Sequence, residues 1–321
     1  MDYYLWLCRK TKSGNTRFFC KKGLKHMRTF RLEIDQTNAG HTIKDIFRHQ
    51  FSFSTHMISR LKVSGGVQLN GKQVRVTHMV QEGDILCAIM PEEHTWIAPS
   101  DVVVPILYED EDILIADKPP NMAVHPSAGN RENTLANALM GHWQRRGEQY
   151  IFRAVNRLDK GTSGLMAVAK NPHSHHILSR QLQEGRLNRT YLAICCGNTN
   201  ENGKIDLPIS RIPGSTMKRQ ISSNGKNAIT HYQTIQRLDG YSLIELRLET
   251  GRTHQIRVHM SAIGHPLAGD WLYGERIDEL DRPALHSSSI SFPHPINHKM
   301  IMLTSKLPTD LKSFLDGREY L

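Results

Sequence analysis

The stretch NRLDKGTSGLMAVAK, residues 156–170, most constrains how this chain can fold. Three charged side chains, Arg157, Asp159 and Lys160, come just before a Gly-Thr-Ser-Gly turn, whose two glycines permit backbone angles that other residues avoid. The apolar run that follows, residues 165–169, is typical of a short buried strand. The sequence therefore predicts a carboxylate in a loop at the edge of a hydrophobic core, which is a rigid support for a catalytic group.

A purely structural interpretation of this loop competes with a catalytic one. An ion pair between Arg157 and Asp159 can close a loop, while Thr162 and Ser163 satisfy backbone groups. For a single aspartate in such a loop this structural role is the more common one, so the local residues leave both interpretations open.

The whole stretch RLDKGTSGL resembles the catalytic-loop motif (H)RLDxxTSGL of the RluA-type pseudouridine synthases. Asn156 is the one departure, because the family usually has His at that position. The resemblance implies that Asp159 is the catalytic aspartate and that Arg157 fills the gap left when the target base leaves its stack. It also implies an α+β fold, with a mixed, mostly antiparallel sheet in the catalytic domain.

Two further stretches resemble motifs of the same family. DKPPNMAVHPS, residues 117–127, is similar to KPxGLxVHP, which implies a loop that supports the active site. RTYLAI, residues 189–194, is similar to KxYxA and implies that Tyr191 faces the target base. A phenol there would stack on the uracil ring and help to move a proton. A tyrosine in a strand is otherwise normally a core or surface residue without a catalytic role.

The second dense cluster, TGRTHQIRVHM at residues 250–260, is either a cationic surface helix or a further motif of this family, which it matches closely. The resemblance implies that Arg257 pairs with the catalytic aspartate, and that Arg252 and His254 shape the site or contact RNA. GHPLAGD, which follows, resembles the family's GHPxxGD turn. RPALHS resembles RxxLHA, which implies that Leu285 packs against the floor of the active site.

An N-terminal segment has a different pattern. Residues 42–47 and 54–62 predict two short amphipathic helices, with Ser54 as an N-cap, and Asn70-Gly71 predicts a hairpin turn. This order resembles the RNA-binding domain of ribosomal small-subunit protein four. The resemblance implies that four cations contact RNA phosphates, although any one of them can be a solvated surface residue: Arg60, Lys62, Lys72 and Arg75.

The chain of 321 residues is long enough for about two domains. We expect a basic extension without stable structure at residues 1–26, a small α/β RNA-binding domain at 27–91, a linker at 92–100 and the catalytic domain at 101–321. Met27 is an alternative start, since the ordered pattern begins right after it.

Composition favours an anionic partner. Lys and Arg number 41 against 31 Asp and Glu, a net charge of +10, which fits nucleic acid as well as a mildly basic enzyme. The five cysteines are scattered without zinc spacing, which fits a reduced compartment, and the apolar runs are too short for a membrane span or a secretory signal. We expect a cytoplasmic monomer without membrane contact.

The implied reaction is the isomerisation of uridine to pseudouridine in structured RNA. It consumes nothing, so no cofactor and no metal are expected. The second domain favours large-subunit ribosomal RNA over transfer RNA as the substrate. Two alternatives remain: a ribosome-assembly factor that binds RNA without catalysis, and a hydrolase that uses Asp159 as its base.

Overall fold

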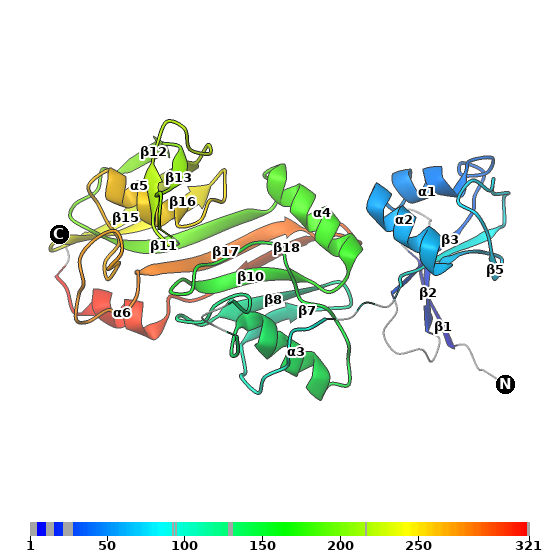
Figure 1. Cartoon of the computed structure of the whole chain (residues 1–321), viewed down its shortest axis with the longest axis horizontal. Coiled ribbons are helices and arrows are strands. Elements are labelled where there is room, and N and C mark those ends of the chain that lie inside the picture. The colour runs from blue at the N-terminus through cyan, green and yellow to red at the C-terminus, as the bar shows by residue number, and fades with distance from the viewer. Residues whose placement is uncertain are drawn as a thin grey trace.

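A computed structural model describes residues 5–10, 16–21, 28–91, 93, 95–127, 131–215 and 217–319. The chain forms a small N-terminal unit and a larger unit built on a long sheet, with the small unit at one end of an elongated molecule (Figure 1). Among the helices of the described residues, none has the length and hydrophobicity of a membrane-spanning segment.

The N-terminal unit packs two helices on a four-stranded antiparallel sheet. Its elements are α1 (Ile43–His49), α2 (Thr55–Ser64), β3 (Thr29–Glu33), β4 (Val67–Leu69), β5 (Lys72–Gln73) and β6 (Ile85–Ile89). The strand order is β3-β6-β4-β5. The predicted N-cap is confirmed, because the Ser54 hydroxyl accepts a hydrogen bond from the Met57 amide. Asn70 and Gly71 both have positive φ angles between β4 and β5, as a tight hairpin requires.

The larger unit contains a ten-stranded sheet. Its strands are β7 (Ile106–Glu109), β8 (Ile113–Lys118), β9 (Arg153–Ala154), β10 (Ser163–Ala169), β11 (Asn188–Cys196), β12 (Asn202–Asp206), β15 (Ile229–Leu238), β16 (Tyr241–Leu248), β17 (Leu285–Pro293) and β18 (Met300–Thr304). The order is β12-β15-β16-β11-β17-β10-β8-β7, with β9 beside β10 and β18 beside β17. Only the β10–β17 pair is parallel, so the predicted mixed, mostly antiparallel α+β fold is confirmed.

Helices cover both faces of this sheet (Figure 1). They are α3 (Leu135–Arg145), α4 (Pro172–Gln183), α5 (Gln255–Ala262) and α6 (Thr309–Asp316), and a separate hairpin is formed by β13 (Ile209–Arg211) and β14 (Arg219–Ile221). Every residue of β10 is buried. Its alternate side chains enter two cores, Met166 and Val168 with α3 and α5, and Leu165 and Ala167 with α4. The predicted buried strand thus lies in the interior of the sheet, between β17 and β8.

The described part of the expected basic extension forms a hairpin of β1 (Leu5–Lys10) and β2 (Thr16–Lys21). This differs from the expected lack of structure, because each run obtains its hydrogen-bond partners from the other, which a local pattern does not reveal. Met27 lies outside the described residues. The expected domain boundaries stay predictions.

Candidate active site

The predicted catalytic aspartate lies in the loop between β9 and β10. The Asp159 carbonyl accepts a hydrogen bond from the Thr162 amide, which closes the turn before β10. The Asp159 side chain is 25% exposed. Its carboxylate is therefore accessible to solvent, while the hydrogen-bonded turn holds its backbone in place. Gly164 has a φ of +108°, and a Cβ there would lie 2.3 Å from the Ser287 carbonyl oxygen. Only glycine lets β10 approach β17 this closely at the start of the strand that follows the Asp159 loop.

Two nitrogen atoms flank one oxygen of the Asp159 carboxylate. His254 Nε2 and Arg257 Nη1 each lie 3.9 Å from Asp159 Oδ2. His254 is the N-cap residue of α5, with φ at +57°, and Arg257 is the third residue of the helix. The stretch TGRTHQIRVHM therefore brings two of its side chains to the Asp159 loop, 95 or more residues away in sequence. That Arg257 pairs with a catalytic aspartate stays a prediction.

Arg257 has a closer partner than the predicted one. Its Nε and Nη2 each donate to a different carboxylate oxygen of Asp270 at 2.7 Å, a bidentate pair in which both residues are buried. Burial by itself lowers the pKa of Arg257, but the hydrogen bonds and charge of Asp270 and the charge of Asp159 outweigh burial, so the pKa is raised. Asp270 thus fixes the guanidinium, whose Nη1 remains directed at Asp159.

Lys118 ties the loop at residues 117–127 to the Asp159 loop. Its ammonium donates to the carbonyls of Pro119 (2.9 Å), Met122 (2.8 Å) and Lys160 (3.2 Å), and its side chain is fully buried. Burial lowers the pKa of Lys118 to about 7, with the charge of Arg282 acting in the same direction and the charge of Asp159 against it. The loop at residues 117–127 therefore reaches the backbone of the residue that follows Asp159.

Tyr191 and Leu285 lie in the core next to the Asp159 loop. Both are buried in the same hydrophobic cluster as Leu158 and Ile256, the neighbours of Asp159 and Arg257 in the chain. A register shift in the β11–β17 pairing falls at Tyr191. That Tyr191 faces the target base stays a prediction.

The remaining predicted residues around the loop occupy different settings. Arg157 is exposed beside Asp159. Arg252 is also exposed, and its Nε donates to the Asn227 carbonyl at 2.9 Å. Asn156 is buried, and its Oδ1 accepts from the Ala167 amide of β10 at 3.0 Å, so the residue that replaces the family's His anchors the loop to the strand.

The four predicted RNA-binding cations of the N-terminal unit divide into two groups. Lys62, Lys72 and Arg75 are exposed. Arg60 instead donates to Glu93 at 2.6 Å, and the same carboxylate pairs with Arg153 of β9, so Arg60 is committed to an ion pair between the two units.

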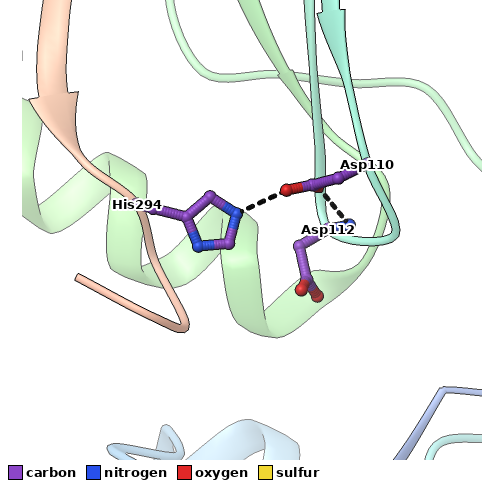
Figure 2. Close-up of side chains that lie close together, drawn as sticks. All are labelled: Asp110, Asp112 and His294. Carbon is purple, nitrogen blue, oxygen red and sulfur yellow. Dashed lines mark hydrogen bonds and ion pairs between the residues drawn. The ribbon is translucent and has the colours of Figure 1, made fainter. Parts of the chain in front are cut away.

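One group in the described residues has the side chains of a metal site, namely Asp110, Asp112 and His294 (Figure 2). Its ligand atoms are already engaged. His294 Nδ1 accepts two backbone amides, so Nε2 carries the proton and donates to Asp110 at 2.8 Å. The Asp112 oxygens accept from Asn171 and from Arg28 of the N-terminal unit. This arrangement fits a structural joint between the units.

Three residues of the site carried no predicted role: Lys118, Asp270 and Tyr273. Lys118 and Asp270 belong to stretches that resemble family motifs, and that position is the signal that singles them out. Tyr273 hydrogen-bonds His254 through its hydroxyl at 2.9 Å and lies three residues beyond GHPLAGD, outside the motifs quoted above.

Comparison with known proteins supports one family throughout. Residues 112–262 match the family described as RNA pseudouridylate synthase, and residues 30–86 match the RluD ribosomal pseudouridine synthase N-terminal domain. The chain is 38% identical to "Uncharacterized RNA pseudouridine synthase YjbO" of Bacillus subtilis (strain 168), over 87% of this chain and 100% of the relative. It is 40% identical to "Ribosomal large subunit pseudouridine synthase D" of Haemophilus ducreyi, over 70% of this chain and 74% of the relative.

A solved structure agrees with these sequence comparisons. "Human RNA Pseudouridylate Synthase Domain Containing 1" superposes with a TM-score of 0.57 at 26% identity, covering 72% of this chain and 92% of that chain. The motifs, the site and the relatives together show that this chain belongs to the RluA-type RNA pseudouridine synthases, isomerases that convert uridine in RNA to pseudouridine.

Proposed function

We propose that this chain isomerises specific uridines of large-subunit ribosomal RNA, with Asp159 as the reacting carboxylate. The observation that carries the proposal is the Asp159 side chain, partly exposed on a fixed loop with Arg257 and His254 beside one of its oxygens. The ribosomal target is supported by the match of residues 30–86 to an N-terminal domain of ribosomal enzymes and by the name of the Haemophilus ducreyi relative.

The reaction breaks the bond between uracil N1 and the ribose, turns the base and joins its C5 to the same ribose carbon. The proton on C5 is lost and N1 gains one, so no other reactant is consumed. Asp159 either attacks the nucleoside or removes a ribose proton, and a carboxylate beside a fixed guanidinium suits both steps. The base must leave its stack to reach Asp159, and the exposed Arg157 would fill the gap.

The other residues have supporting roles in this proposal. Tyr191 would hold the uracil ring while it turns, and Leu285 would line the floor beneath it. Arg252, exposed on the loop before α5, would contact the RNA backbone with Lys62, Lys72 and Arg75 of the N-terminal unit. Such phosphate contacts add affinity without reading sequence. We further propose that the protein works as a cytoplasmic monomer without a cofactor.

The deciding experiment is pseudouridine mapping across all stable RNAs in cells that lack this protein, with wild-type and Asp159→Ala chains returned separately. We expect one or a few large-subunit sites to vanish in the deletion and to return only with the wild-type chain, because the variant has no carboxylate to react. Purified Asp159→Ala protein should still bind the RNA around those sites.

Three results would contradict the proposal. Restoration of the sites by Asp159→Ala would remove Asp159 from the chemistry. Sites that appear only in transfer RNA would replace the ribosomal target, and rescue of ribosome assembly by the variant without any modified site would favour a binding factor.

A further inference from the structure

Tyr273 contacts both groups that flank Asp159. Its hydroxyl oxygen lies 2.9 Å from His254 Nδ1, and its ring meets the His254 ring edge to face, with centroids 5.6 Å apart. The Arg257 guanidinium lies over the same ring, with Cζ 5.0 Å from the centroid. The Ser261 hydroxyl donates to the Tyr273 carbonyl at 2.8 Å, which anchors the tyrosine backbone to α5.

The hydrogen bonds of the Tyr273 hydroxyl determine which nitrogen of His254 carries the proton. The Arg219 amide of β14 donates to the hydroxyl oxygen at 2.8 Å. The hydroxyl proton then needs an acceptor, and His254 Nδ1 is in place. If Nδ1 carried a proton instead, the tyrosine oxygen would accept hydrogen bonds from both Nδ1 and the Arg219 amide, and the hydroxyl proton would have neither of these nitrogens as an acceptor. The bonding therefore favours an unprotonated Nδ1 and a proton on Nε2.

The protonated Nε2 is the nitrogen that faces Asp159. It lies 3.9 Å from Oδ2, the same oxygen that Arg257 Nη1 approaches at 3.9 Å. Burial lowers the pKa of His254, against the charge of Asp159, so the ring is neutral near pH 7 and its tautomer decides whether Asp159 meets a proton or a lone pair. These long contacts are of the kind that tighten when substrate binds.

We propose that Tyr273 is a positioning residue that holds His254 in the Nε2–H tautomer, so that two donors fix Asp159 Oδ2 and leave Oδ1 to the uridine. The inference rests on the proposed function for its catalytic consequence, and the tautomer itself can be observed without any substrate. Because Arg219 belongs to β14, the same hydroxyl also joins the β13–β14 hairpin to the active site.

The test uses the full chain with Tyr273→Phe, which keeps the ring under Arg257 and removes only the hydroxyl. Tyr241→Phe is the matched control, since Tyr241 packs on Phe314 and Arg318, away from the site. Long-range proton–nitrogen NMR of protein labelled at its 18 histidines reports each tautomer, and a His254→Gln sample assigns the His254 signals.

We expect an unprotonated Nδ1 and a protonated Nε2 for His254 in the wild-type chain and in Tyr241→Phe. In Tyr273→Phe, signals of the Nδ1–H or doubly protonated ring should appear. The kcat on ribosomal RNA should fall about tenfold, as removal of about one hydrogen bond to the reacting assembly implies, while KM changes less than about twofold.

A wild-type His254 that carries its proton on Nδ1 would overturn the inference, even if the Tyr273→Phe chain failed to fold. So would a folded Tyr273→Phe chain with wild-type tautomer signals and wild-type kcat. If the wild-type chain shows the Nε2–H tautomer but modifies no ribosomal RNA, the proposed function fails while the positioning of His254 by Tyr273 stands.

Discussion

At the residue scale, the Asp159 carboxylate is arranged by side chains that are distant in sequence. Arg257 and His254 approach it from the start of α5, and each is fixed in turn by one further residue, Asp270 or Tyr273. The motif resemblance singled out Arg257 and His254, and both lie 3.9 Å from the Asp159 carboxylate, while their roles stay predictions. It did not reveal that the shortest contacts of Arg257 go to Asp270, because a pairing between buried groups depends on distances that a sequence does not contain.

Lys118 allows a prediction about pH at this scale. Its pKa is about 7 in the folded chain and near 10.4 when unfolded, so between these values the unfolded state binds more protons and stability rises with pH. Below pH 7 the buried Lys118 ammonium lowers the free energy of unfolding by its full amount, and above pH 7 this loss disappears as the ammonium gives up its proton. The free energy of unfolding of the wild-type chain, relative to Lys118→Met, should therefore increase by about 2 kcal/mol from pH 7 to pH 9.

Urea unfolding of both proteins across this range measures the difference, and titrations that the two chains share cancel. A difference that stays flat would mean that the three carbonyls around Lys118 keep its ammonium charged throughout.

At the scale of elements, β10 and the start of α5 create the site. The apolar pattern of residues 165–169 correctly predicted a buried strand, whose side chains enter a hydrophobic core on each face of the sheet. The pattern could not tell that β17, more than 100 residues later, pairs with β10 in parallel at Ser163 and Gly164. Strand neighbours are set by the packing of the whole sheet, whereas hydrophobic periodicity is local.

Gly164 tests how much the site depends on this pairing. In Gly164→Ala the new Cβ would meet the Ser287 backbone, at a φ of +108° that alanine already disfavours. We expect a loss of at least about 3 kcal/mol of unfolding free energy and a comparable loss of activity, because β10 must move away from β17 and carry the Asp159 loop with it.

Gly185→Ala is the matched control. Gly185 also has a positive φ, +68°, but a Cβ there would meet no atom within 4 Å. This variant should lose only about 1 kcal/mol and keep its activity, since only the backbone conformation is penalised. Equal losses in the two variants would show that the close approach to Ser287 contributes nothing.

At the scale of the whole molecule, the N-terminal unit is attached to the catalytic unit by specific contacts. Arg28 donates to Glu111 and Asp112. The Glu93 carboxylate forms ion pairs with both Arg60 and Arg153. The rings of Phe30 and Phe53 pack against His173 at the start of α4. These contacts place the small unit beside α4, at the end of the long sheet (Figure 1). An RNA that contacts both units would therefore bind two surfaces that are held in a fixed relative position.

The exposed cations of the small unit test this view of RNA binding. A triple variant, Lys62→Gln, Lys72→Gln and Arg75→Gln, should bind ribosomal RNA more weakly. It should also lower the slope of log affinity against log salt by about 2 to 3, because fewer counterions are released when fewer phosphates are neutralised by the protein. The kcat at saturating RNA should be unchanged, since none of the three residues lies at Asp159.

Replacement of the exposed Lys299, Lys306 and Lys312 by Gln removes the same charge from the catalytic unit and serves as the control. If both triple variants lower affinity and salt slope equally, net charge accounts for binding and the N-terminal unit holds no specific RNA surface.

The sequence by itself determined the order of elements around the site, the buried strand after the catalytic loop, the two-helix N-terminal unit and the family. These follow from local patterns and from motifs, which can be read from the sequence without knowledge of the tertiary structure. Only the tertiary structure decided that Asp270 holds Arg257, that Tyr273 bonds to His254 and that Arg60 serves the joint between units. Each of these is a contact between polar groups from distant segments, and such partners are chosen by distance and burial once the sheet has formed.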